Sequence, residues 1–374
     1  MNKKARLENL NILRGFSAFA IVMYHIRKNV GCDFGIFNWL FSYSTPWMTC
    51  FFVLSGFTLF YNYCDTDFDL NNIKKFVKKR ALGIYPTYAL MWFCFYWYYF
   101  NQVPAKSDIL TFPLQLLLLQ CIDYYDFFIN SGTWFFSCIF ICYLLFPYLC
   151  SIFRRLDNRL LLIFLIVAYI INTVLPFSYD PCNIDVYHSA FCRILEFSCG
   201  ICTAAFFLRK QSDTKSFTLV ISLTVFFSAI FIADRTDVIL MSSYQDRMNA
   251  FTLPLVCVLV YQLSSCRNRQ VHLAATCKIT KFFSNLSMGC YAGSLFAQTI
   301  YSELINKHAL IYGHRNLIAI TAVFVLNLIF AYAIDNYAKY AKKFINRHGF
   351  YKIFIAFAIL MIISIGIKTA IQGI

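Results

Sequence analysis

Charged residues are scarce in this chain. They make up 14% of its 374 residues, whereas 60% of the residues are hydrophobic. The mean hydropathy is correspondingly high, at +0.60. A soluble globular domain carries about 25% charged residues, so this composition excludes a sizeable soluble domain. Apolar runs of about 20 residues recur along the whole chain instead, and each is long enough to cross a bilayer.

Acidic residues are the scarcer of the two charge types, with 18 Asp and Glu against 33 Lys and Arg, a net charge of +15. Such an excess is compatible with nucleic-acid binding, but its distribution favours membrane topology. Basic residues concentrate in alternate loops, as cytoplasmic loops do. The sequence therefore predicts a multi-pass membrane protein with a cytoplasmic N-terminus and no nucleic-acid partner. Of the 33 basic residues, 23 lie in segments 1–8, 64–81, 152–160, 209–216, 264–281 and 335–352.

The chain also lacks a Gly/Ser-rich linker, a detectable internal repeat and an evident cleavable signal. We therefore expect one membrane-embedded domain over 1–374, all-α, a polytopic bundle of about 10–11 spanning helices, the last over 353–371. The apolar stretch 109–120 is too short to span comfortably. Because both its flanks must lie outside, it is predicted to be a re-entrant or interfacial helix. The expected spans begin near residues 9, 46, 82, 133, 160, 190, 216, 244, 282, 316 and 353.

Cysteine is not scarce, with 16 residues, but most of these lie inside apolar runs. There a cysteine behaves as a small hydrophobic residue. Cys199 and Cys202 have the spacing of a metal or redox pair, yet no histidine accompanies them in their expected span. We therefore predict no metal site and no permanently bound cofactor.

The first expected span contains two ionisable residues, Arg14 and His25. Such residues inside an apolar span are costly and indicate a functional site. Eleven helical steps turn the chain by about 1100°, so the two side chains lie roughly 20° apart around the axis and about 16 Å apart along it. This face suits an elongated, anionic ligand that reacts at its far end. His25 could take a proton from a hydroxyl.

Each residue also has a purely structural interpretation. Arg14 could extend to the inner interface together with the basic residues before it, and His25 could pack between helices. Their common face favours function.

Two further motifs follow. Ser55 and Gly56 lie in the run Phe51–Phe57, where Gly56 permits close helix approach and Ser55 offers a hydroxyl inside the membrane. The basic run 74–80, with Lys79 and Arg80, precedes Ile84-Tyr85-Pro86. These cations could reflect topology alone or bind phosphates at the cytoplasmic face.

Together these motifs resemble the acyltransferase 3 family of integral membrane O-acyltransferases. The family's opening helix has Arg, ten residues and then His within a Leu-Arg-Gly frame. Its second helix reads Phe-Phe-x-x-Ser-Gly-Phe, and its third has basic residues and an Ile-x-Pro-x-Tyr run. Looser matches extend the resemblance over roughly residues 7–335: Trp134-Phe135, Tyr143–Pro147, Arg193–Phe197 with Gly200, and Leu286–Tyr291.

The resemblance implies transfer of an acyl group, usually acetyl, from cytoplasmic acyl-CoA as co-substrate to a hydroxyl of a cell-envelope polysaccharide or lipid-linked glycan. It favours a bacterial cytoplasmic membrane, where membrane lipids surround the bundle. His25 and Arg14 would be catalytic, and His25 could act as a base or form an acyl-histidine. Arg14, Arg80 and Lys79 would contact acyl-CoA. The residues expected to shape the site or bind substrate are Ser55, Tyr85 and Trp134.

Three positions depart from the family pattern. Gly83 stands where many members have a second Arg, the segment Trp134–Cys138 lacks a Glu, and Ser294 stands where the late helix often has His. Two rival functions therefore remain open: a flippase or transporter of envelope precursors, and a non-catalytic membrane partner on the same scaffold. The sequence leaves the oligomeric state, the acceptor sugar and the acyl chain open.

Overall fold

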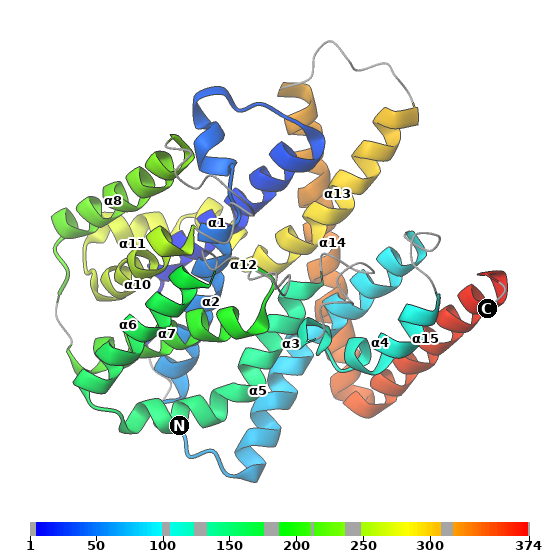
Figure 1. Ribbon diagram of the computed structural model, residues 1–374, viewed down its shortest axis with the longest axis horizontal. Helices are drawn as coiled ribbons and strands as arrows, with labels where there is room; N and C mark the ends of the chain where they lie inside the picture. Colours follow the sequence, from blue (N-terminus) through cyan, green and yellow to red (C-terminus); the bar gives the residue numbers. More distant parts are fainter. Residues whose placement is uncertain are drawn as a thin grey trace. The chain divides into compact units, whose positions relative to one another are not determined.

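The described chain is helical almost throughout (Figure 1). A computed structural model describes residues 5–98, 105–122, 133–175, 187–210, 213–235, 248–307 and 317–372. Within these ranges no strand forms, and the β-type pairing consists of an isolated bridge between Thr214 and Cys266. The predicted all-α helix bundle is confirmed.

The chain divides into two compact units, each built from separated segments. The first comprises Met1–Thr66, Tyr148–Cys182 and Ile194–Tyr332, and the second Asp67–Pro147, Asn183–Arg193 and Ala333–Ile374. Three of the five boundaries between the units fall within helices, in α5 (Trp134–Arg155), α7 (Ala190–Arg209) and α14 (Leu317–His348).

The remaining helices belong to one unit each. The first unit contains α1 (Leu10–His25), the π-helix η1 (Ile26–Val30), the 3-10 helix η2 (Gly35–Phe41), α2 (Thr45–Tyr63), α6 (Asn158–Val174), α8 (Ser216–Arg235), α10 (Asn249–Ser265), α11 (Arg269–Thr276), α12 (Lys278–Asn285) and α13 (Ser287–Lys307). The second contains α3 (Leu70–Tyr98), α4 (Ala105–Leu116), the 3-10 helix η3 (Gln120–Ile122) and α15 (Phe350–Gln372).

Every expected span coincides with a helix, although the start expected near residue 244 lies outside the described residues. Five described helices, α5, α7, α8, α14 and α15, are long and apolar enough to cross a membrane. The helices α6 and α10 are apolar but shorter, and α1 has 16 residues. The exact number of spans therefore stays a prediction.

The basic segments expected as inner loops are largely helical. Helix α3 begins at Leu70, about one helical turn before the lysine cluster, and continues unbroken through it. Lysine and arginine are good helix formers, so the segment extends the helix while its lysines Lys74, Lys75, Lys78 and Lys79 stay exposed. Likewise the expected loop 264–281 contains α11 and the start of α12.

Helix α1 packs against several other helices of the first unit. It contacts α2, α10, α11, α12 and α13. Phenylalanines fill these contacts: Phe16 meets the ring of Trp47 edge-on at 5.3 Å, and Phe19 meets Phe283 at 5.8 Å. Edge-to-face pairs of this kind are favourable beyond the area they bury, so aromatic packing holds α1 among its neighbours.

Helices α2 and α7 cross with their backbones in contact at two glycines. A Cβ atom on Gly56 would lie 1.9 Å from the carbonyl oxygen of Phe197, and one on Gly200 would lie 2.1 Å from that of Val53. Small residues permit this close approach between membrane helices. The structure confirms the close helix approach expected at Gly56 and adds Gly200 as its counterpart.

Replacing Gly200 by alanine is expected to destabilise the protein strongly. The colliding atoms belong to the backbone, so the cost should exceed the roughly 1–3 kcal/mol of ordinary overpacking. The matched control is Gly366→Ala on α15, where an added Cβ meets no atom within 4 Å, and where the change should be neutral or stabilising by about 0.5–1 kcal/mol. Thermal unfolding in detergent measures both. Equal melting temperatures for the two variants would contradict the crossing.

Candidate active site

The two ionisable residues of the first span lie on one regular helix. Helix α1 runs without a break from Leu10 to His25 and includes Arg14. The rise of an α-helix therefore places His25 about 16 Å beyond Arg14 and on nearly the same face. Both side chains are half-buried, so one side of α1 presents a cation near its start and an imidazole at its end.

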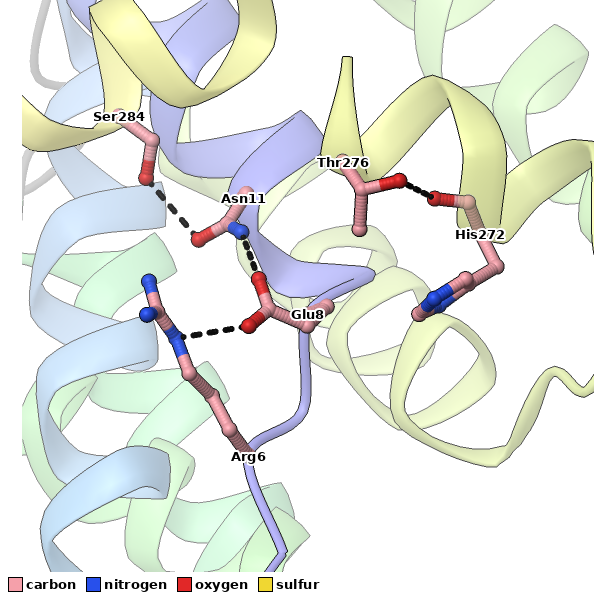
Figure 2. A network of polar contacts seen from close by, with 6 residues as sticks. All are labelled: Arg6, Glu8, Asn11, His272, Thr276 and Ser284. Atoms are coloured by element: carbon pink, nitrogen blue, oxygen red, sulfur yellow. Dashed lines mark hydrogen bonds and ion pairs between the residues drawn. The ribbon is translucent and has the colours of Figure 1, made fainter. Parts of the chain in front are cut away.

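Polar contacts fix the start of α1 (Figure 2). Asn11 donates to Glu8 at 2.7 Å and accepts from the Ser284 hydroxyl at 3.1 Å, while Arg6 pairs with the second oxygen of Glu8 at 3.2 Å. Asn9 donates to the carbonyl of Cys266 at 2.7 Å. These bonds join α1 to α12 and to the end of α10, so the depth and rotation of Arg14, three residues after Asn11, are set by neighbouring helices.

The contact between α1 and α12 is close one residue beyond Arg14. A Cβ on Gly15 would lie 3.0 Å from the carbonyl oxygen of Thr280 and 3.4 Å from the amide nitrogen of Ser284. The glycine of the Leu-Arg-Gly frame therefore serves packing, and it brings α12 against the turn of α1 that carries Arg14.

The helix changes character directly after His25. The π-helix η1 follows, and it is capped by Gly31, whose φ of +75° suits glycine. π-Helical turns occur frequently at functional sites. The Nδ1 atom of His25 is buried and has no hydrogen-bond partner among the residues that the structure describes. The imidazole is therefore not committed to a structural bond through this nitrogen.

An amide pair lies one turn beyond His25. The Asn29 side-chain amide, on η1, donates to Gln298 Oε1 on α13. Gln298 is only 3% exposed. Sequence reasoning missed both residues, because neither stands in a motif and their pairing joins positions far apart in the chain. The only available signal was a glutamine inside an apolar helix.

The loop that follows η1 is held by its own side chains. Asp33 accepts hydrogen bonds from the Asn38 amide and from the Gly35 backbone N–H, the latter at 2.8 Å. These bonds, with that of Asn38 the stronger influence, hold the pKa of the exposed Asp33 below its ordinary value. The loop after the π-helix thus carries a fixed negative charge.

Ser55 lies half-buried on α2, which packs against α1. Its backbone carbonyl accepts a hydrogen bond from Thr58 at 3.3 Å. Next to it, Gly56 makes the contact with α7 described above. Ser55 therefore sits in the same unit as Arg14 and His25, and its role in shaping the site stays a prediction.

The remaining expected site residues, Lys79, Arg80, Tyr85 and Trp134, belong to the second unit. Lys79 is exposed, whereas Arg80 is half-buried. The Arg80 guanidinium stacks over the ring of Phe76 at 5.2 Å and of Tyr143 at 5.6 Å. Two aromatic rings therefore orient the Arg80 cation, and its expected contact with acyl-CoA stays a prediction.

Tyr85 is tied to α4. Its hydroxyl donates to the carbonyl of Leu116 at 3.0 Å, and that of Tyr88 donates to the carbonyl of Gln115 at 2.6 Å. These bonds satisfy carbonyls at the end of α4, which a helix leaves without partners. Leu118, shortly after the end of α4, adopts a left-handed backbone conformation with a φ of +59°. The Tyr85 hydroxyl thus has a structural role, and its expected contribution to the reaction stays a prediction.

Trp134 begins α5 within a cluster of rings. It packs against Tyr187 at 5.0 Å and His188 at 4.8 Å, and the guanidinium of Arg193 lies 5.5 Å from its centre. Arg193 donates through Nε to the Tyr187 carbonyl at 2.9 Å. Because Trp134 is only 6% exposed, its face is covered by this cluster, and substrate contact there stays a prediction.

The cysteines do not form a metal site in the described ranges, where no group of three or more ligating side chains gathers. Cys199 and Cys202 are both free and buried on α7.

Residues 7–336 match the family model of an acyltransferase domain, that of the acyltransferase 3 family. The chain belongs to this family. It is a membrane acyltransferase with several apolar helices able to span the bilayer. No curated protein and no solved structure matches the chain.

Two of the three places where this acyltransferase departs from the family pattern, the segment Trp134–Cys138 and position 294, contain a serine with a structural bond. Ser137 donates to the carbonyl of Leu118 at 2.9 Å and accepts from the backbone N–H of Cys121 at 3.1 Å, which secures the turn after α4. Ser294 donates to the carbonyl of Tyr291 in its own helix at 2.7 Å. The third, Gly83, is exposed and has no atom within 4 Å of an added Cβ, so the open space there would admit a larger side chain.

The substitution Tyr85→Phe tests the structural role of the hydroxyl. Loss of its bond to Leu116 should lower stability by about 1 kcal/mol and leave acyl transfer near the wild-type rate. Melting temperature and transfer rate, measured on the same detergent preparation, check this. A large fall in rate at unchanged stability would place the Tyr85 hydroxyl in the reaction instead.

Proposed function

We propose that this acyltransferase moves an acyl group, usually acetyl, from cytoplasmic acyl-CoA to a hydroxyl of a cell-envelope polysaccharide or lipid-linked glycan. The observation that carries the proposal is α1, which presents Arg14 and His25 about 16 Å apart on one helical face. The pantetheine arm of CoA is comparable in length. A bacterial cytoplasmic membrane with the N-terminus inside fits the distribution of basic residues.

The reaction needs one base. His25 takes the proton of the acceptor hydroxyl as its oxygen attacks the thioester carbonyl carbon, so a C–O bond forms and the carbonyl oxygen becomes negative. Collapse of this intermediate breaks the C–S bond, and the proton passes from His25 to the departing CoA thiolate. The products are the glycan ester and CoA thiol. In the alternative route, His25 itself accepts the acyl group before the hydroxyl does.

Arg14 has the charge and the position to hold a phosphate of the donor. Guanidinium groups bind phosphate through paired, charge-assisted hydrogen bonds. Asn9 and Asn11 hold this part of α1 against α10 and α12, so the cation is preorganised. A phosphate held here would leave the extended arm to run along α1 toward His25.

Arg80 and Lys79 are the second proposed set of phosphate contacts. The rings of Phe76 and Tyr143 orient Arg80, while the exposed Lys79 adds charge on the same helix. Their contribution to donor binding is proposed separately from that of Arg14.

The substitution His25→Ala should abolish transfer, because removing a general base costs about 10²–10⁴ in rate. Purified protein in nanodiscs receives radiolabelled acetyl-CoA and a crude envelope glycan fraction, and label in the glycan is counted. The matched control is His272→Ala, an exposed histidine on α11, which should transfer normally. Wild-type transfer by His25→Ala would discard His25 as the base.

Two other measurements separate the rival functions, a transport measurement in sealed vesicles and a measurement of envelope acyl content in cells. Movement of glycan without consumption of acetyl-CoA would support a flippase or transporter. An acyl content of the cell envelope that is unaffected by His25→Ala would support a non-catalytic partner, as the absent Glu and late His allow.

The substitution Arg14→Gln should raise the half-saturating concentration of acetyl-CoA about 10- to 100-fold, the equivalent of about 1.5–3 kcal/mol for a charged hydrogen bond. S-acetylpantetheine lacks the nucleotide phosphates, so its transfer should change little in the same variant. Arg155→Gln at the exposed end of α5 removes the same charge and is the control. Equal losses with both donors would assign Arg14 to the reaction centre and not to phosphate binding.

A further inference from the structure

The region beyond His25 contains a second polar feature that the proposed reaction has not used. It consists of Gln298 on α13 and Asn29 on η1, joined by the bond from the Asn29 amide to Gln298 Oε1. Helix α13 packs along both α1 and η1. Asn29 lies four residues beyond His25, on the π-helix that directly follows α1.

Gln298 has an unused donor. Its side chain is almost fully buried, and its Nε2 atom has no hydrogen-bond partner within the described part of the chain. Leaving a buried donor unsatisfied costs about 1–3 kcal/mol, so such groups in folded proteins call for an explanation. The His25 Nδ1 atom is in the same condition. Two buried, unsatisfied nitrogens therefore lie on neighbouring turns of packed elements.

Two other polar side chains near Gln298, Ser294 and Asn327, use their donors in bonds to helix backbone. On α13, Ser294 bonds to Tyr291 in its own helix. On α14, the Asn327 amide donates to the Cys290 carbonyl of α13 at 3.0 Å. The donors of both side chains thus serve helix packing, whereas Gln298 is oriented by Asn29 and keeps its N–H groups available.

We propose that Gln298, oriented by Asn29, positions the acceptor glycan by donating a hydrogen bond to a sugar oxygen beside the hydroxyl that is acylated. This inference rests on the proposed function and extends it to the acceptor. It makes Gln298 a positioning and specificity-determining residue, and it gives the acceptor a stated feature: a hydrogen-bond acceptor oxygen next to the reacting hydroxyl.

The neighbouring oxygen suits Gln298 better than the reacting one. The attacking oxygen needs a lone pair for the carbonyl carbon and gives its proton to His25. An N–H donor on that oxygen would withdraw the electron density that attack requires. An oxygen one carbon away has lone pairs to spare, and a bond to it fixes the orientation of the sugar ring without weakening the nucleophile.

The test compares Gln298→Met with wild type in the nanodisc assay, using the same envelope glycan fraction and labelled acetyl-CoA. Methionine keeps the length of the side chain and removes its hydrogen bonds. The half-saturating amount of glycan should rise about tenfold, equivalent to about 1.4 kcal/mol, while that of acetyl-CoA stays within twofold. The variant Asn29→Ala, at an exposed position, removes the orienting bond and should raise the glycan value by a smaller factor.

The matched control is Gln262→Met on α10. Gln262 is half-buried, and its Oε1 also lacks a partner in the described ranges. It lies beside Leu263, whose carbonyl accepts from Asn9 at the start of α1, and so at the opposite end of α1 from His25. This variant should leave both half-saturating values unchanged.

Each outcome decides the proposal. Unchanged glycan dependence in Gln298→Met, or an equal shift in the acetyl-CoA value, overturns the positioning role while the acyltransferase stands. Absence of transfer by wild-type protein overturns the proposed function itself, and the role of Gln298 with it. If Gln298→Met does not fold, the result with Asn29→Ala decides. A rise in its half-saturating amount of glycan, without a rise in that of acetyl-CoA, supports the proposed role of the pair. Absence of that rise refutes it.

Discussion

The cost of burying polar groups in an apolar helix bundle governs this structure. Several buried polar side chains bond to a neighbouring helix. Glu196 of α7, fully buried, accepts from Asn249 of α10 at 2.5 Å and from Thr49 of α2 at 3.3 Å. At the start of α1, Asn9 donates to the carbonyl of Cys266 and Asn11 accepts from Ser284 of α12. Because these bonds join helices across the first unit, they fix the position of α1 and so of the residues it carries.

Other buried polar atoms have no hydrogen-bond partner in the described residues, and two nitrogens near the end of α1 are among them. His25 Nδ1 and Gln298 Nε2 remain buried without a partner in the described residues. A polar group that a fold does not satisfy internally indicates a place for a ligand or for chemistry. Both atoms lie where the chain turns from α1 into the π-helix η1 and meets α13. The proposed acceptor end of the site is therefore identified by what the packing leaves unsatisfied.

Close packing provides the second constraint. Gly56 and Gly200 let α2 and α7 touch through their backbones, and Gly15 lets α12 approach α1 beside Arg14. The Ser-Gly and Leu-Arg-Gly motifs that resemble the family pattern thus owe their glycines to helix contact. The residues beside them, Ser55 and Arg14, are not needed for that contact, and their expected roles in the site stay predictions.

The sequence by itself determined the helical class, the spacing of Arg14 and His25 and the family, because hydrophobic runs and motif spacing are local properties. It also indicated a short helix over 109–120, and the structure places α4 at Ala105–Leu116, followed by Leu118 in a left-handed conformation. Only the tertiary structure decided that the Tyr85 hydroxyl serves α4, that rings cover Trp134, and that Asn29 meets Gln298. These pairings join positions far apart in the chain, and no pattern in a single sequence records which distant side chains will meet when the helices pack.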